Sequence, residues 1–543
     1  TSMSNSAAQQ RDLCTALSIS GFNCNANYAA ADTSGADNNP NELINFIRFS
    51  STTFNGSGGT RLDNSAATSW KLGDIWHSTP TIVGPPKGVF NSVGYGNFKT
   101  NNSTRQQVLI VGANDGMLHA FDDNGSGARG RELWSFIPNN LLGKLKDLNT
   151  GHAFYVDASP TAADVCLNTT NCGKSAEVAS DWKTVVITGE RDGGKAYFAL
   201  DITDTTNPRH LWQFTDDNLG NTWSKPAIGK VRVKSGNNYE DHWAAFFGGG
   251  TSTTDDVGNR FYVVDIGTGD TLGTGAGNKT KYTIGGGANK VPGAPRAVDL
   301  NGDYYVDTVF FGDTNGKLWM LNTTNTTPSP NNWPAREIFD PTLTHKTISC
   351  SATGAQTITE HSSGTHLSRP IYYMPAIALD ANFKPLVMFG TGYIDDYISE
   401  TGSTVQNYFY VTRLERTAYT GIASSNEYIT ELVFTALTPG ERVVGAPVVW
   451  GGHVFYATYM PPATSDCCGV GRGYIRWSEL KSCGLSGIID VGVGIPAGPV
   501  IVGEQMWITT STDPKPKDPC SLPGANCPQP TGNNAETIYW RER

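Results

Sequence analysis

The stretch Val108-Leu-Ile-Val-Gly-Ala-Asn-Asp-Gly-Met-Leu-His-Ala-Phe121 decides the fold. It reads as an apolar run, a glycine-containing turn and a second apolar run. This pattern predicts two antiparallel strands joined by a hairpin, in which Asn and Gly supply the positive φ of a type I′ turn. The pattern returns at Val309-Phe-Phe-Gly-Asp-Thr-Asn-Gly-Lys-Leu-Trp319, and looser versions follow at 185–200, 244–264, 386–411 and 454–477.

A proline that opens a short strand precedes most of these hairpins. It recurs about 50 to 80 residues apart, at Pro80, Pro160, Pro226, Pro295, Pro375, Pro447 and Pro499. A further strand often follows, as at 132–136, so each unit has about four strands. Because one small sheet cannot bury both of its faces, such units stack radially around an axis. We therefore expect an all-β fold, a seven-bladed β-propeller, with six or eight blades as the alternative counts.

Composition agrees with many short strands joined by turns. The 543 residues include 61 glycines and only 17% charged residues, and glycine favours turns. The net charge of −10 and the lack of basic runs argue against a nucleic-acid partner. No stretch approaches the roughly 18 apolar residues of a membrane span. We expect residues 71–543 to form the propeller and residues 1–70 to be an extension with one short helix at 41–48.

The ten cysteines favour an oxidising compartment, and thus an exported protein. Three close pairs, Cys14/Cys24, Cys166/Cys172 and Cys520/Cys527, are expected to close short loops. Cys467 and Cys468 could form a vicinal disulfide, or one of them could pair with Cys483. Cys350 has no evident partner. The long inserts at 270–290, 340–366 and 512–534 are expected to be surface loops, and the segment 536–540 could supply a closing strand.

The most specific chemical motif is Asp299-Leu-Asn-Gly-Asp-Tyr-Tyr-Val-Asp307. Oxygen-bearing side chains occupy positions 1, 3, 5 and 9, and position 7 of such a loop offers a main-chain carbonyl, as in an EF-hand. The predicted ligands of one calcium ion are the side chains of Asp299, Asn301, Asp303 and Asp307 and the carbonyl of Tyr305. Several carboxylates held this close together repel one another unless a cation binds them.

The motif departs from a full EF-hand at two positions. Position 6 is Tyr304 instead of glycine, and position 12 is Phe310 instead of a bidentate glutamate. Both flanks read as strands, so we expect a shortened loop within one blade. The alternative is a solvated turn without a metal.

Four motifs together resemble the C-terminal domain of the PilY/PilC proteins, the tip-associated factors of bacterial type IV pili. They are residues 72–80, residues 112–121, the Asp299 loop followed by 312–319, and residues 385–392. The resemblance covers roughly residues 40 to 510. It implies a modified seven-bladed propeller with one calcium site, and a chain that is a fragment of a longer protein.

The resemblance also implies a function. Calcium binding would antagonise pilus retraction and its release would permit it, in a factor for pilus biogenesis, twitching motility, surface adhesion and virulence. Pilins, minor pilins and a host or abiotic surface would be the partners. The location would be extracellular, at the pilus (fimbrium) tip and the outer cell surface, without integration into the membrane.

Two other interpretations remain open. Quinoprotein-like repeats, such as Ala199-Leu-Asp201 followed by Trp212, also occur in alcohol dehydrogenase propellers that hold pyrroloquinoline quinone and calcium. Their calcium ligands are dispersed around a central pocket, whereas here they are contiguous, so we expect no enzyme and no catalytic residues. The third interpretation is an adhesin in which tightly bound calcium only stabilises a blade.

Overall fold

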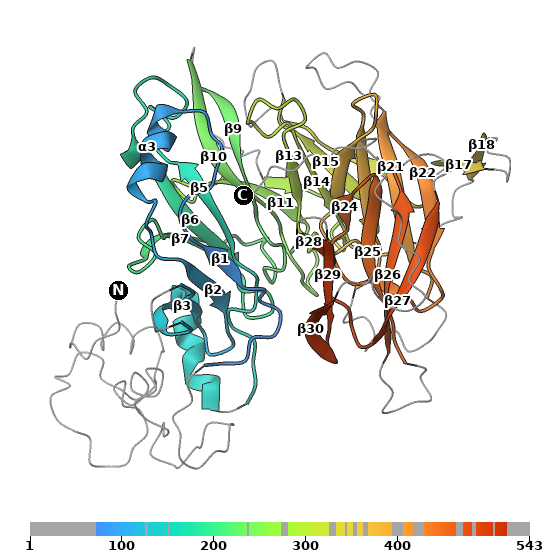
Figure 1. The fold of residues 1–543 in the computed structure, drawn as a ribbon, viewed down its shortest axis with the longest axis horizontal. Coiled ribbons are helices and arrows are strands. Elements are labelled where there is room, and N and C mark those ends of the chain that lie inside the picture. Colours follow the sequence, from blue (N-terminus) through green and yellow to red (C-terminus); the bar gives the residue numbers. More distant parts are fainter. Residues whose placement is uncertain are drawn as a thin grey trace. The chain divides into compact units, whose positions relative to one another are not determined.

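The computed structural model describes residues 72–124, 129–149, 151–235, 238–272, 281–324, 333–342, 345–350, 356–361, 368–393, 405–415, 428–462, 471–480, 485–502 and 505–517. The regular secondary structure of these residues is almost entirely β-strand. The strands of each sheet are near one another in sequence, so each sheet occupies a narrow band of colour in Figure 1. Among the described residues, no helix has the length and apolar character needed to cross a membrane.

The chain divides into two compact units, and the described part of the first comprises residues 72–87, 93–165 and 178–225. It contains two four-stranded antiparallel sheets and three helical segments. The first sheet has β1 (Thr81–Val83), β2 (Val108–Gly112), β3 (Leu118–Asp122) and β4 (Glu132–Phe136). The second has β5 (Thr161–Cys166), β6 (Trp182–Gly189), β7 (Tyr197–Asp201) and β8 (Arg209–Phe214). The helical segments are α3 (Val93–Asn101), η1 (Asn139–Asn149) and η2 (Ala179–Asp181).

The described part of the second unit comprises residues 88–92, 166–177 and 226–517. Its first two sheets each have four strands. One contains β9 (Ala227–Ser235), β10 (Asn238–Gly248), β11 (Arg260–Asp265) and β12 (Lys281–Thr283). The other contains β13 (Arg296–Val298), β14 (Thr308–Gly312), β15 (Leu318–Asn322) and β16 (Ala335–Phe339).

Three further sheets of this unit depart from the four-stranded plan. A six-stranded sheet contains β17 (His345–Cys350), β18 (Gln356–His361), β19 (Ala376–Leu379), β20 (Pro385–Gly390), β21 (Tyr408–Glu415) and β22 (Tyr428–Ala436). A five-stranded sheet contains β23 (Arg442–Val443), β24 (Val448–Trp450), β25 (His453–Met460), β26 (Arg472–Glu479) and β27 (Ser486–Val493). The last contains β28 (Val500–Val502), β29 (Gln505–Thr510) and β30 (Asp513–Lys517).

Successive sheets within a unit pack through their apolar faces. In the first unit, Val108 and Leu118 of one sheet share a buried cluster with Val186 and Phe198 of the next. In the second unit, β11 and β14 pack together through Phe261 and Phe311, whose stacked rings lie 3.9 Å apart. Further clusters join each remaining pair of successive sheets in this unit. Neighbouring sheets of one unit therefore bury the faces that a single sheet leaves exposed.

The prolines of the sequence repeat each stand at the start of a strand, and every described sheet contains one such strand. Each one stands immediately before a strand, namely β1, β5, β9, β13, β19, β24 or β28. Proline cannot donate to a strand ladder, so this position uses its fixed φ without losing a hydrogen bond. The all-β prediction is confirmed, and four of the seven described sheets have the four strands expected of each repeat unit. Seven blades remain a prediction, because the expected closing strand at 536–540 lies outside the described residues.

In five sheets a glycine ends the strand after the one that follows the repeat proline, here named the second strand: β2, β6, β10, β14 or β20. A Cβ atom placed there would lie 2.1 to 2.7 Å from an atom of the segment that leads to the next sheet. The five glycines, each followed by its neighbour, are Gly112 (Val156), Gly189 (Thr222), Gly248 (Val291), Gly312 (Ile371) and Gly390 (Val443). Only glycine permits these close approaches of two chain segments.

The structure corrects two expectations. The hairpins at 113–117 and 313–317 exist, but they are not type I′ turns, because only Gly116 and Gly316 have positive φ. They are three-residue loops in which glycine takes the left-handed position. The inserts are not only loops: 345–361 contains the β17–β18 hairpin, and β17 pairs in parallel with β22. Short strands β12 and β30 also lie within or beside inserts.

Candidate metal centre

The loop from Asp299 to Asp307 connects two antiparallel strands of one sheet. Val298, the last residue of β13, pairs with Thr308, the first residue of β14. The N–H of Asp307 donates to the carbonyl of Val298 at 2.8 Å, which closes the base of the loop. The first and last acidic residues are thereby held next to each other. Both are buried, whereas Asn301 and Asp303 are exposed.

The loop wraps its main chain around the two buried carboxylates. Oδ1 of Asp299 accepts the N–H of Asn301, Gly302 and Asp303 at 3.2, 2.7 and 3.3 Å, and Oδ2 accepts the N–H of Tyr304 at 2.7 Å. Oδ2 of Asp307 accepts the N–H of Leu300 at 2.7 Å. These bonds fix the loop as a curled ribbon with its acidic side chains on the inside.

The exposed ligand candidates approach the same point. The Asn301 amide nitrogen lies 3.3 Å from Oδ2 of Asp303 and 3.3 Å from Oδ1 of Asp307. Oδ1 of Asp303 accepts the N–H of Tyr305 at 2.9 Å. The structure therefore brings together the four side chains that the sequence predicted, with Tyr305 beside them in the chain.

The electrostatics of the loop suit a cation. The pKa of Asp307 is raised to about 6, chiefly by burial and also by the charges of Asp303 and Asp299, against the hydrogen bonds from Leu300 and Asn301. A carboxylate that is costly to ionise in this setting gains from a divalent cation close by. The donors are all oxygens, the ligand type that calcium prefers. The residues present fit a calcium ion.

Tyr304 takes the conformation that the sixth position of an EF-hand gives to glycine. Its φ is +69°, in the left-handed region that non-glycine residues seldom adopt. The hydrogen bond from its N–H to Asp299 holds this conformation. At this position the residue type differs from the EF-hand pattern, but the backbone keeps the same turn.

A second cluster of potential ligands lies in the first unit. Among the described residues, His77, Asp157 and Asp192 are the set of three acidic or histidine side chains whose ligand atoms lie within 4.8 Å of one another. The carboxylates of Asp299, Asp303 and Asp307 are not all within this distance of one another. His77 Nδ1 lies 2.5 Å from Asp157, and Arg191 Nε lies 3.6 Å from the same oxygen. The cation of Arg191 and the hydrogen bond with His77 therefore already compensate Asp157, without a metal ion.

The predicted disulfide between Cys166 and Cys172 is present. Cys14, Cys24, Cys467, Cys468, Cys483, Cys520 and Cys527 lie outside the described residues, as does the expected helix at 41–48. Cys350 lies in β17. The other pairings remain predictions.

The fold and the loop together define a β-propeller with an acidic hairpin loop in one sheet. The model of the PilY1 beta-propeller domain family matches residues 72–412, and the chain belongs to this family. The crystal structure of the Pseudomonas aeruginosa PilY1 C-terminal domain is similar, with a TM-score of 0.52 and 18% identity, over 80% of this chain and 98% of that one.

Curated relatives point to the same family. A type IV pilus biogenesis factor PilY1 homolog of Xylella fastidiosa is 28% identical, over 87% of this chain and 39% of its own length. The type IV pilus biogenesis factor PilY1 of P. aeruginosa PAO1 is 32% identical, over 48% of this chain and 21% of its own length. The chain thus spans well under half the length of these relatives.

Proposed function

We propose that this chain is a calcium-binding part of a type IV pilus biogenesis factor. One ion is bound by the side chains of Asp299, Asn301, Asp303 and Asp307 and by the main-chain carbonyl of Tyr305. The observation that supports the proposal is the hairpin loop, which holds Asp299 and Asp307 next to each other at its base and places Asn301 between Asp303 and Asp307. The family membership and the names of the relatives support the role in pilus biogenesis.

In this proposal calcium is a signal. A bound ion neutralises the clustered carboxylates and stiffens the loop, which opposes pilus retraction; release of the ion permits retraction, twitching motility and surface attachment. The protein acts as an exported adhesin at the pilus tip and outer cell surface, in contact with pilins and minor pilins. Regulation requires a dissociation constant near micromolar, whereas much tighter binding would indicate a structural ion.

Calorimetric titration of the purified chain with calcium tests the site. We expect one ion per chain for the wild type, and binding lost or weakened at least about tenfold in Asp303→Ala and Asp307→Ala. Asp303 is exposed, so its replacement leaves packing intact. Asp255→Ala, at an exposed carboxylate outside the loop, is the matched control and keeps wild-type affinity. Equal binding by all four proteins contradicts the assignment.

Pilus counts in cells test the biological part. Cells in which the full-length protein carries Asp303→Ala are expected to show fewer surface pili, with the Asp255→Ala cells normal. Normal piliation in cells whose protein no longer binds calcium would refute regulation of retraction. Alcohol oxidation with an artificial electron acceptor, after addition of pyrroloquinoline quinone and calcium, would instead indicate an enzyme.

A further inference from the structure

We propose that Tyr305 is a positioning residue that couples the calcium loop to the β9–β10 ribbon and to the Cys166–Cys172 loop. The inference rests on the calcium binding proposed above. The main chain of Tyr305 stands at the seventh position of the loop, where the carbonyl is a ligand. Its side chain is held by residues that are distant in sequence and belong to other elements.

The Tyr305 phenol is bonded to both charged partners of an ion pair. Its hydroxyl donates to Oδ2 of Asp241 at 2.6 Å and accepts a hydrogen bond from Arg232. Arg232 Nε in turn donates to Oδ1 of Asp241 at 3.1 Å. Lys230 Nζ and Arg232 Cζ lie 3.9 and 4.2 Å from the centre of the Tyr305 ring. Charge-assisted hydrogen bonds and cation–π contacts of this kind fix the ring in one place.

The partners of Tyr305 stand on a paired two-stranded ribbon. Arg232 of β9 is directly opposite Asp241 of β10 in the register, and Asp241 is buried. The main chain next to Tyr305 is tied to the same ribbon, because the N–H of Val306 donates to the carbonyl of Lys230 at 2.8 Å. The C-terminal half of the calcium loop is therefore anchored to β9 twice, whereas its ligands Asn301 and Asp303 face solvent.

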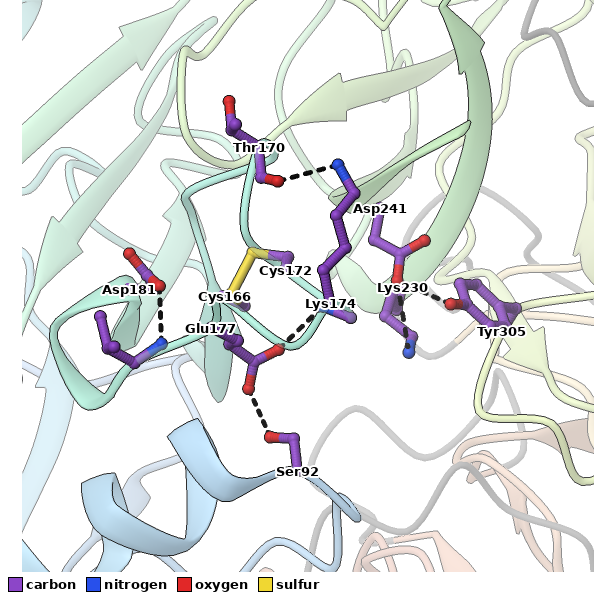
Figure 2. Close-up of a disulfide and its surroundings, with 12 residues drawn as sticks. Ser92, Cys166, Thr170, Cys172, Lys174, Glu177, Asp181, Lys230, Asp241 and Tyr305 are labelled. Atoms are coloured by element: carbon purple, nitrogen blue, oxygen red, sulfur yellow. Dashed lines mark hydrogen bonds and ion pairs between the residues drawn. A yellow bond between two sulfur atoms is a disulfide. The ribbon is translucent and has the colours of Figure 1, made fainter. Parts of the chain in front are cut away.

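The disulfide loop also lies close to Asp241, at Gly173. Gly173 follows Cys172, and a Cβ atom at Gly173 would lie 2.1 Å from Oδ2 of Asp241 and 3.8 Å from the Tyr305 hydroxyl. The N–H of Gly173 donates to Oε2 of Glu177 at 2.8 Å, and Ser92 donates to the other oxygen of Glu177. Figure 2 shows Ser92 and Glu177 together with the disulfide, Asp241 and Tyr305.

The cluster is also within electrostatic reach of a predicted ligand. Lys230 Nζ lies 3.9 Å from Oδ2 of Asp241 and 3.9 Å from the centre of the Tyr305 ring. A cation of β9 therefore contacts the seventh residue of the loop. Because coupling between two sites is reciprocal, a change at β9–β10 must equally alter calcium affinity.

Calorimetry on Tyr305→Phe tests the coupling, since this variant keeps the ring and loses only the hydroxyl. We expect calcium affinity to fall about fivefold or more, with a similar loss in Asp241→Asn and no additional loss in the double variant. Tyr304→Phe removes a hydroxyl from the adjacent exposed tyrosine and is the matched control, expected to bind as the wild type does. Thermal unfolding in EDTA reports the purely structural effect of each variant.

Hydrogen exchange supplies an independent readout. Calcium is expected to slow amide exchange in β9, β10 and residues 166–177 of the wild type. In Tyr305→Phe, calcium is expected to have no such effect. Wild-type calcium affinity in Tyr305→Phe and Asp241→Asn would overturn the inference, even if both unfold at a lower temperature. A wild-type protein that takes up no calcium would instead refute the proposed function, so the two failures are distinguishable.

Discussion

At the scale of single residues, Tyr304 shows how the loop tolerates an unfavourable conformation. Its φ of +69° places Cβ near the following carbonyl oxygen, and the ring is partly exposed, with 39% of its surface open to solvent. The ring lies 6.5 Å from that of Phe90, centre to centre. The hydrogen bond to Asp299 thus retains the turn, although a tyrosine disfavours this conformation.

Two replacements that both remove the ring separate the cost of this conformation from the loss of contacts. Asparagine tolerates the left-handed region and β-branched valine does not, so we expect Tyr304→Val to be less stable than Tyr304→Asn by roughly 1 to 2 kcal/mol. Urea denaturation in EDTA measures the difference. Equal stabilities would show that the loop relaxes to another conformation without calcium.

His119 is a buried histidine between two acidic side chains. Nε2 lies 3.1 Å from Asp115 Oδ1, and Nδ1 lies 2.8 Å from Glu132 Oε1. Burial lowers its pKa, but the hydrogen bonds with Asp115 and Glu132 outweigh burial and raise the pKa to about 9. The imidazolium form therefore contributes to the stability of the first unit.

The stabilisation by His119 is expected to depend on pH. A pKa raised from 6.5 to about 9 makes the contribution complete below pH 6.5 and removes it as pH rises through 9. His119→Gln should lose up to roughly 3 kcal/mol at about pH 6 and much less at about pH 10. Urea denaturation of both proteins at the two pH values checks this. A difference that is independent of pH would mean that His119 is neutral in the folded protein.

At the scale of elements, the glycine that ends a second strand is a packing device shared by five sheets. A Cβ atom at Gly312 would lie 2.3 Å from the side chain of Ile371. We expect Gly312→Ala to destabilise the protein by about 1 to 3 kcal/mol through overpacking. Gly286→Ala is the control, because no atom lies within 4 Å of a Cβ placed there. Thermal denaturation distinguishes the two, and similar melting temperatures would show that the sheets separate easily.

The sequence predicted the positions of the strands better than the type of turn that joins them. The repeated prolines marked the start of one strand in each described sheet, because proline has few permitted positions in a strand. The prediction of type I′ turns was wrong. Asn and Asp side chains can accept hydrogen bonds from the nearby backbone and support a three-residue loop instead. Asp313 Oδ1, for example, accepts the N–H of Asn315 at 2.9 Å. The β17–β18 hairpin was missed because its polar residues lack a continuous apolar run.

At the scale of the whole molecule, the contiguous ligand loop could be predicted because its spacing is local. The partners of Tyr305 could not, because Lys230, Arg232 and Asp241 approach it only through the pairing of β9 with β10. The same holds for the set His77, Asp157 and Asp192, which lie on three separate segments. Contacts of this kind are properties of the folded chain, and no single segment carries their signal.

Calcium is expected to stabilise the folded protein as a whole. With a micromolar dissociation constant, about 1 mM calcium should raise the free energy of unfolding by about 4 kcal/mol. Differential scanning calorimetry with calcium, and with magnesium as the comparison, measures this effect. No shift for the wild type, or an equal shift for Asp303→Ala, would contradict binding at the loop.

The close glycine contacts have a consequence for how such a chain can change over time. They join the end of one strand to the last part of the connection, close to the next sheet, so the earlier part of that connection has no such contact. The β17–β18 hairpin occupies one such connection, between β16 and β19. New segments can therefore be inserted there, and new surfaces acquired, while the arrangement of neighbouring sheets is inherited unchanged.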